Sequence, residues 1–127
     1  MLEHVQGEAI HAILADRFKQ GEIQDGLAAI GCTVPITWRG FGWKDGAEDI
    51  ERFRRAVYDR KVAAPKSLLL RSALADAVCL IDPAGNAKLA KGRALGRIDP
   101  AAAALIAIAE GQRLMARPRS HRRMAWA

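Results

Sequence analysis

The sequence has few cysteines, few aromatic side chains and no long apolar run. Of its 127 residues, two are cysteines (Cys32 and Cys79) and seven are Phe, Trp or Tyr. Two cysteines without a metal-like spacing are too few for a disulfide scaffold, so a reducing compartment is expected. No apolar run approaches the roughly 20 residues that span a bilayer, and the first residues, MLEHVQGEAIHAI, do not follow the signal-peptide pattern. We therefore expect a soluble, intracellular protein.

Several catalytic motifs are also lacking from these 127 residues. There is no G-x-x-x-x-G-K-[ST] phosphate loop, and no G-x-G-x-x-G follows a predicted strand. The serines have no nucleophile-elbow context, and nothing in the sequence marks a base for a cysteine nucleophile. The three histidines are scattered, and His11, which lies in an apolar stretch, is expected to be a packed residue rather than a ligand.

The composition is that of a globular domain with an uneven charge. Half of the residues are apolar and 27% are charged, so one domain with a core of Leu, Ile and Val is expected. Residues 1–62 carry nine Lys/Arg against ten Asp/Glu, a net of −1, whereas residues 63–127 carry eleven against four, a net of +7. A basic half suggests a polyanionic partner such as nucleic acid. A solvated basic face with a disordered tail would give the same count.

Apolar spacing and turn residues predict an α/β arrangement. The predicted elements are a strand over 9–15, a helix over 22–30, a strand over 32–38, helices over 47–59 and 67–75, a strand over 78–81 and a helix over 99–115. Gly31 is expected to end the first helix, Ser67 to cap the third and Pro100 to occupy the first turn of the last. Residues 82–96 have turn chemistry followed by a basic stretch, and Asp82 there is interpreted as a turn residue.

Two acids stand out by their context. Asp16 ends an apolar strand, and Asp99 opens an apolar helix after a basic loop. Carboxylates at such places can face a shared cleft, and phosphodiester cleavage commonly uses two Mg²⁺-like ions held by carboxylates. An ordinary strand end and an ordinary helix start would explain the same two residues.

Three stretches carry a resemblance to a known family. They are LADRFKQGEIQDGLAAIG, VPITWRGFGWKDGAEDIERFRRAV and SLLLRSALADAVCLIDPAGNAKLAKGRALGRIDPAAAALIAIAEG. Their order and spacing resemble the C-terminal part of the nuclease domain of the large terminase subunit of phages and prophages, over about residues 9–112. The resemblance implies an α/β, ribonuclease-H-like fold, a mixed sheet flanked by helices, in a partial nuclease domain over 1–116 with a basic tail over 117–127.

The resemblance also implies a function and its residues. Asp16 matches the second catalytic carboxylate of the family and Asp99 the third, both as ligands of Mg²⁺ or Mn²⁺ in an endonuclease that cuts concatemeric double-stranded DNA during packaging. The basic segment before the third acid is expected to contact DNA through Lys88, Lys91, Arg93 and Arg97. In the whole protein the partners implied are DNA, the small terminase subunit and the portal, with no membrane, in the cytoplasm of a bacterial host.

One departure from the family pattern changes the expected activity. The strand that bears the family's first acid, and the upstream ATPase motor, have no counterpart in these 127 residues. The chain alone is therefore expected to cleave weakly or not at all, and an exposed sheet edge is expected to favour a homodimer. Two alternatives remain open: a non-catalytic basic module for nucleic-acid binding or assembly, and a degenerate prophage remnant.

Overall fold

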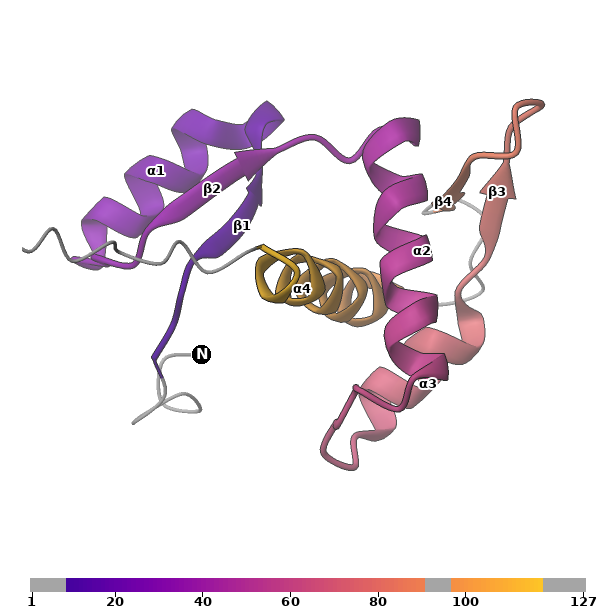
Figure 1. Cartoon of the computed structure of the whole chain (residues 1–127). Coiled ribbons are helices and arrows are strands. Elements are labelled where there is room, and N and C mark those ends of the chain that lie inside the picture. Colours follow the sequence, from indigo (N-terminus) through magenta and orange to yellow (C-terminus); the bar gives the residue numbers. More distant parts are fainter. Residues whose placement is uncertain (1–8, 91–96, 118–127) are drawn as a thin grey trace, which may run out of the picture. The chain divides into compact units, whose positions relative to one another are not determined.

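A computed structural model describes residues 9–90 and 97–117 of the chain (Figure 1). The chain divides into two compact units, Met1–Asp45 and Gly46–Ala127, and each is described by itself. The first unit holds a parallel pair of strands with one helix, and the second holds an antiparallel pair of strands with further helices. Strands and helices therefore mix in both units, as the sequence predicts.

The first unit is built on the parallel strands β1 (Ile13–Asp16) and β2 (Ile36–Arg39). They are joined by the short 3-10 turn η2 (Arg17–Lys19) and the helix α1 (Gln20–Ala29), the kind of crossover that parallel neighbours require. Both strands are shorter than predicted, because the ladder begins at Pro35, whose nitrogen carries no hydrogen to donate. The Pro35 carbonyl accepts from the backbone N–H of Ile13 at 2.8 Å.

Helix α1 ends as predicted but buries little. Gly31 adopts a φ of 66°, and its N–H donates to the Ala28 carbonyl at 3.0 Å, so the glycine supplies the left-handed backbone that closes the helix. Of the predicted apolar face, Ile23 and Leu27 are half-buried, whereas Ile30 is 66% exposed. No residue of α1 is buried.

Helix α2 (Trp43–Tyr58) begins four residues earlier than predicted. The glycines before it indicate a loop, yet Gly46 lies inside the helix. A Cβ added at Gly46 would lie 3.1 Å from the Lys88 Cβ and 3.4 Å from the Ala87 carbonyl oxygen. Gly46 therefore allows the helix to approach the neighbouring strand closely, and its role is packing rather than turning.

The strands of the second unit form a hairpin that the sequence predicts only in part. β3 (Cys79–Ile81) falls within the predicted strand, and β4 (Ala87–Leu89) pairs with it in antiparallel fashion. β4 lies in the segment interpreted as turn and basic loop. Its three residues are too few to show an alternating pattern, and the pairing comes from the turn before it.

Helices α3 (Leu68–Asp76) and α4 (Asp99–Met115) pack against each other, and both agree with the predicted ranges to within one residue. The Ser67 hydroxyl accepts from the Leu70 N–H at 3.1 Å, as an N-cap does. The buried stripe of α4 consists of Ala101, Leu105 and Ala109, at the four-residue spacing of one helix face.

The buried apolar residues are mostly alanines, not the Leu, Ile and Val that the sequence suggests. Among the described residues, six of the nine buried apolar side chains are alanine. Small side chains let α3 and α4 approach closely, while larger apolar groups such as Leu68 (86% exposed) and Ile81 (72% exposed) remain at the surface. The expectation of a large-residue core was therefore wrong.

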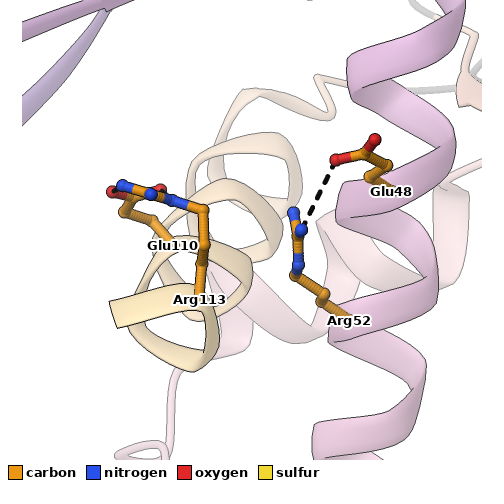
Figure 2. A network of polar contacts seen from close by, with 4 residues as sticks. All are labelled: Glu48, Arg52, Glu110 and Arg113. Atoms are coloured by element: carbon orange, nitrogen blue, oxygen red, sulfur yellow. Dashed lines mark hydrogen bonds and ion pairs between the residues drawn. The ribbon is translucent and has the colours of Figure 1, made fainter. Parts of the chain in front are cut away.

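Ion pairs link neighbouring turns within α2 and within α4, and Figure 2 shows two of them. Glu48 and Arg52 are one turn apart on α2, with an N–O distance of 3.4 Å. On α4 the Arg113 guanidinium donates to both carboxylate oxygens of Glu110, which raises the pKa of Arg113. Pairs within one helix stabilise that helix modestly. No helix in the described part of the chain is long and apolar enough to cross a membrane.

Candidate functional site

Asp16 lies where strand β1 ends and the chain turns into η2. The residue is half-buried, and its Oδ1 accepts from the Phe18 N–H at 3.0 Å, which caps the turn. Within the described residues Oδ2 has no hydrogen-bond partner. The carboxyl ends of parallel strands are a common place for ligands, because loops diverge there and leave polar groups accessible.

The end of the neighbouring strand brings further charged groups to the same edge. Arg39 is directly opposite Asp16 in the register of the two strands. At the following residue, Gly40, an added Cβ would lie 2.9 Å from Asp45 Oδ2 and 4.0 Å from the Arg17 guanidinium. Asp45 is thus a third carboxylate that was not predicted, because its position among the closely spaced glycines Gly40, Gly42 and Gly46 indicated only a loop.

Asp99 is the first residue of α4, and its side chain is exposed. Pro100 follows it in the first helical turn, as predicted. A carboxylate in this position interacts favourably with the helix dipole, so a purely structural role would also explain it. Asp16 belongs to the first unit and Asp99 to the second, and their convergence on one pocket stays a prediction.

The two acids fit a divalent cation by their donor chemistry. Mg²⁺ and Mn²⁺ prefer carboxylate oxygens, and Asp16 has one oxygen open while Asp99 is exposed. Within residues 9–90 and 97–117, no group of three or more His, Cys, Asp or Glu side chains is arranged to hold a metal ion. The described residues therefore offer separate carboxylates rather than a complete ligand cage.

The predicted DNA-contacting residues fall partly within the described structure. Lys88 lies on β4, is half-buried and is engaged in a contact of its own. Arg97 is exposed, two residues before α4. Lys91 and Arg93 lie outside the described residues. Of this set, Arg97 is the described side chain best placed to meet a phosphate.

Asp82 has the role in the turn that the sequence predicts. Its two carboxylate oxygens accept from the Asn86 backbone N–H at 2.8 Å and from the Asn86 side-chain amide at 2.9 Å. These bonds lower the pKa of Asp82, the side-chain bond having the largest effect. Gly85, with a φ of 85°, completes the turn.

His11 differs from expectation. The histidine is exposed, because strand β1 begins only at Ile13 and leaves His11 outside the sheet. The apolar stretch over 9–15 therefore predicted too long a strand, because its residues pair with another strand only from Ile13 onward.

Comparisons with known proteins place the chain. No family model matches it. It is 31% identical over 84 residues to the large terminase subunit of Enterobacteria phage HK97, a match that covers 66% of the chain and 17% of that protein. The crystal structure of the HK97 bacteriophage large terminase matches with a TM-score of 0.79 at 26% identity, over 86% of this chain and 23% of that one.

The chain thus spans about a fifth of the length of the proteins it matches. The small sheets flanked by helices, together with the structural match, bear out the predicted α/β, ribonuclease-H-like fold class. Sequence and structure agree on the same relative, and the chain is homologous to a part of a phage large terminase subunit.

Proposed function

We propose that this chain is the part of a packaging terminase that supplies metal-binding carboxylates for endonucleolytic cleavage of concatemeric double-stranded DNA. The observation that supports it most is the position of Asp16. Asp16 is half-buried and ends a parallel strand, with one carboxylate oxygen capping η2 and the other open, in a chain homologous to a part of a terminase. A strand end of this kind holds a carboxylate in place without consuming all of its lone pairs.

Asp16 and Asp99 would hold Mg²⁺ or Mn²⁺. When bound, such ions help to generate a hydroxide nucleophile and stabilise the leaving oxygen of the phosphodiester. Two divalent ions bring four positive charges, of which two carboxylates offset half. We therefore expect weak metal binding and little or no cleavage by these 127 residues alone.

The basic side chains of the second unit would neutralise DNA phosphates near Asp99. Arg97 lies two residues before Asp99 and is exposed, so a phosphate contact at Arg97 would bring the DNA backbone close to Asp99. In a full-length terminase the same surface would act in the context of DNA packaging, with the small subunit and the portal as partners. Phosphate contacts of this type give affinity without sequence preference.

The metal-binding proposal is tested by titrating Mn²⁺ into the chain in a calorimeter. The Asp16→Asn variant removes the charge but keeps a side-chain oxygen that can accept from the Phe18 N–H, so the turn should survive. We expect binding heat in the wild type and its loss in Asp16→Asn and Asp99→Asn. The matched control is Asp25→Asn, an exposed acid on α1, which should titrate like the wild type.

A non-catalytic nucleic-acid-binding module is the second candidate, and two observations favour it. Asp16 caps a turn and Asp99 opens a helix, so both acids have structural duties. The excess of cations in residues 63–127 is also sufficient for DNA binding by itself. DNA binding by a protein that gives no Mn²⁺ heat in any variant would favour this module and contradict the nuclease proposal.

A further inference from the structure

The cations of the first unit are not spread over its surface. Residues 1–45 contain four Lys/Arg, and each follows the carboxyl end of a strand by no more than five residues or is its last residue. They are Arg17, Lys19, Arg39 and Lys44. The acids on α1, Glu22 and Asp25, lie away from the strand ends in sequence. One edge of the parallel pair therefore collects all four of these cations, together with the carboxylates of Asp16 and Asp45.

An aromatic side chain projects from the same edge. Phe18 is 95% exposed, the highest exposure among the large apolar side chains described. It occupies the middle of η2, whose backbone is fixed by the hydrogen bond from the Phe18 N–H to Asp16. Exposing a large apolar ring to water costs free energy in the free protein, and a bound partner that covered the ring would recover it.

The two residues that flank Phe18 are cationic and exposed. Within the described part of the chain, Arg17 and Lys19 make no hydrogen bond or ion pair through their side chains. Cationic side chains beside an exposed ring disfavour an apolar protein partner, because removing their charge from water would cost more free energy than burying the ring gains. A polyanion with flat apolar faces would both compensate the positive charges and cover the ring.

A second cation and ring stand at the end of the neighbouring strand. The Arg39 guanidinium lies over the Phe41 ring, 5.5 Å from its centroid, and Arg39 Nε donates to the Gly40 carbonyl at 3.3 Å. Phe41 is 38% exposed. Stacking on the ring orients the guanidinium at the edge, and an oriented guanidinium suits phosphate geometry.

We propose that Arg17, Phe18, Lys19, Arg39 and Phe41, here termed the edge cluster, form a binding surface for single-stranded or frayed DNA. In this proposal the side chains of Arg17, Lys19 and Arg39 contact phosphates, and an unpaired base stacks on Phe18. Bases inside a duplex are already paired and stacked, so duplex DNA could not make the contact with Phe18. This combination of a cationic track with an aromatic platform is how single strands are bound without sequence preference. The inference deepens the proposed function, because it adds a DNA contact beside Asp16 that does not depend on metal.

The edge cluster is tested by fluorescence anisotropy with the full chain, a labelled single-stranded oligonucleotide and the matching duplex, in EDTA over a salt series. We expect Phe18→Ala to weaken single-strand binding by about five- to fiftyfold and duplex binding much less. Phe18→Trp should bind as tightly as the wild type, because the larger ring still stacks. Ile30→Ala, which truncates another exposed apolar residue of the unit, should change nothing.

The charge contribution is read from the salt dependence of the same assay. Removing one phosphate contact with Lys19→Gln should lower the slope of log affinity against log salt by about 0.7. The edge cluster is excluded if Phe18→Ala and Ile30→Ala bind alike, or if Phe18→Leu binds as well as Phe18→Trp. A change in oligomeric state caused by Phe18→Ala, with unchanged DNA affinity, would assign the ring to a protein contact instead.

The outcome is separable from that of the nuclease proposal. Asp16→Asn keeps the turn and all members of the edge cluster, so it should lose Mn²⁺ binding and retain single-strand binding. If neither the wild type nor any variant binds Mn²⁺ while the wild type binds single-stranded DNA, the nuclease proposal is contradicted and the edge cluster is not. Intact metal binding with no effect of Phe18→Ala would do the reverse.

Discussion

Asp16 shows how one side chain can serve both the backbone and a ligand. Its Oδ1 caps the turn that follows β1, and the same turn presents Phe18 to solvent. The cap restrains the carboxylate, so a cation at Oδ2 would meet a group whose rotamer freedom is already reduced. Sequence alone could place Asp16 at a strand end, but the cap and the exposed ring depend on the backbone path of η2.

The hydrogen bonds between Asp82 and Asn86 should make the environment of Asn86 depend on pH. The pKa of Asp82 is lowered in the folded hairpin by the bonds from Asn86, whereas an unfolded aspartate titrates at about 3.9. A depressed folded pKa means that the stabilisation is present above the unfolded value and is lost as pH falls through the folded one. We expect the Asn86 amide signal in NMR spectra to stay unchanged down to pH of about 4 and to shift only below it.

The Asp82→Asn variant is the control for that titration. It removes the titrating group, so the Asn86 amide should no longer respond to acid in this range. If the wild-type carboxyl titrated at or above the ordinary aspartate value, the hydrogen-bonded turn would not be the state present in solution.

Among the elements, the helices were more predictable than the strands. Ser67, Pro100 and the apolar spacing identified α3 and α4, because capping and periodicity are local in sequence. β4 was missed, since a three-residue strand shows no period and depends on its partner across the turn. The start of α2 was missed because Gly46 favours a loop locally and a close approach to β4 in the folded protein.

The close approach at Gly46 predicts that a larger side chain there destabilises the protein. Gly46→Leu would force a side chain between α2 and β4, where even a Cβ would lie 3.1 Å from Lys88 Cβ, and should lower the free energy of unfolding by about 1–3 kcal/mol. Gly26→Leu is the matched change on α1, where an added Cβ meets nothing within 4 Å. It should be neutral or stabilise by about 0.5–1 kcal/mol through helix propensity.

Urea unfolding followed by far-UV circular dichroism measures both variants. Equal effects of the two substitutions would show that α2 does not rest on the hairpin through Gly46. A selective loss in Gly46→Leu would confirm that glycine is required there for packing.

For the whole molecule, the order of the motifs predicted the family that the chain resembles. The composition did not predict which residues form the core. The resemblance to a terminase predicted from three stretches agrees with the match to the HK97 protein in both sequence and structure. The alanine-rich core was not anticipated, because a composition does not show which apolar residues are buried. Asp16 and Asp99 could be singled out from the sequence as acids at element ends, and their role stays a prediction. The edge cluster could not be recognised before the parallel pairing placed Arg39 beside Asp16.

We propose above all that Asp16 and Asp99 each serve as a ligand of a divalent cation. Substoichiometric Mn²⁺ broadens the NMR signals of nearby amides, so it reports directly on which residues surround the ion. We expect the amides of Arg17 and Asp99 to broaden in the wild type while Gly85 in the hairpin turn is spared, with Asp16→Asn abolishing the effect at Arg17 and Asp99→Asn abolishing the effect at residue 99. A wild-type protein in which either acid is spared, or broadening at Arg17 that persists in Asp16→Asn, would contradict the proposal.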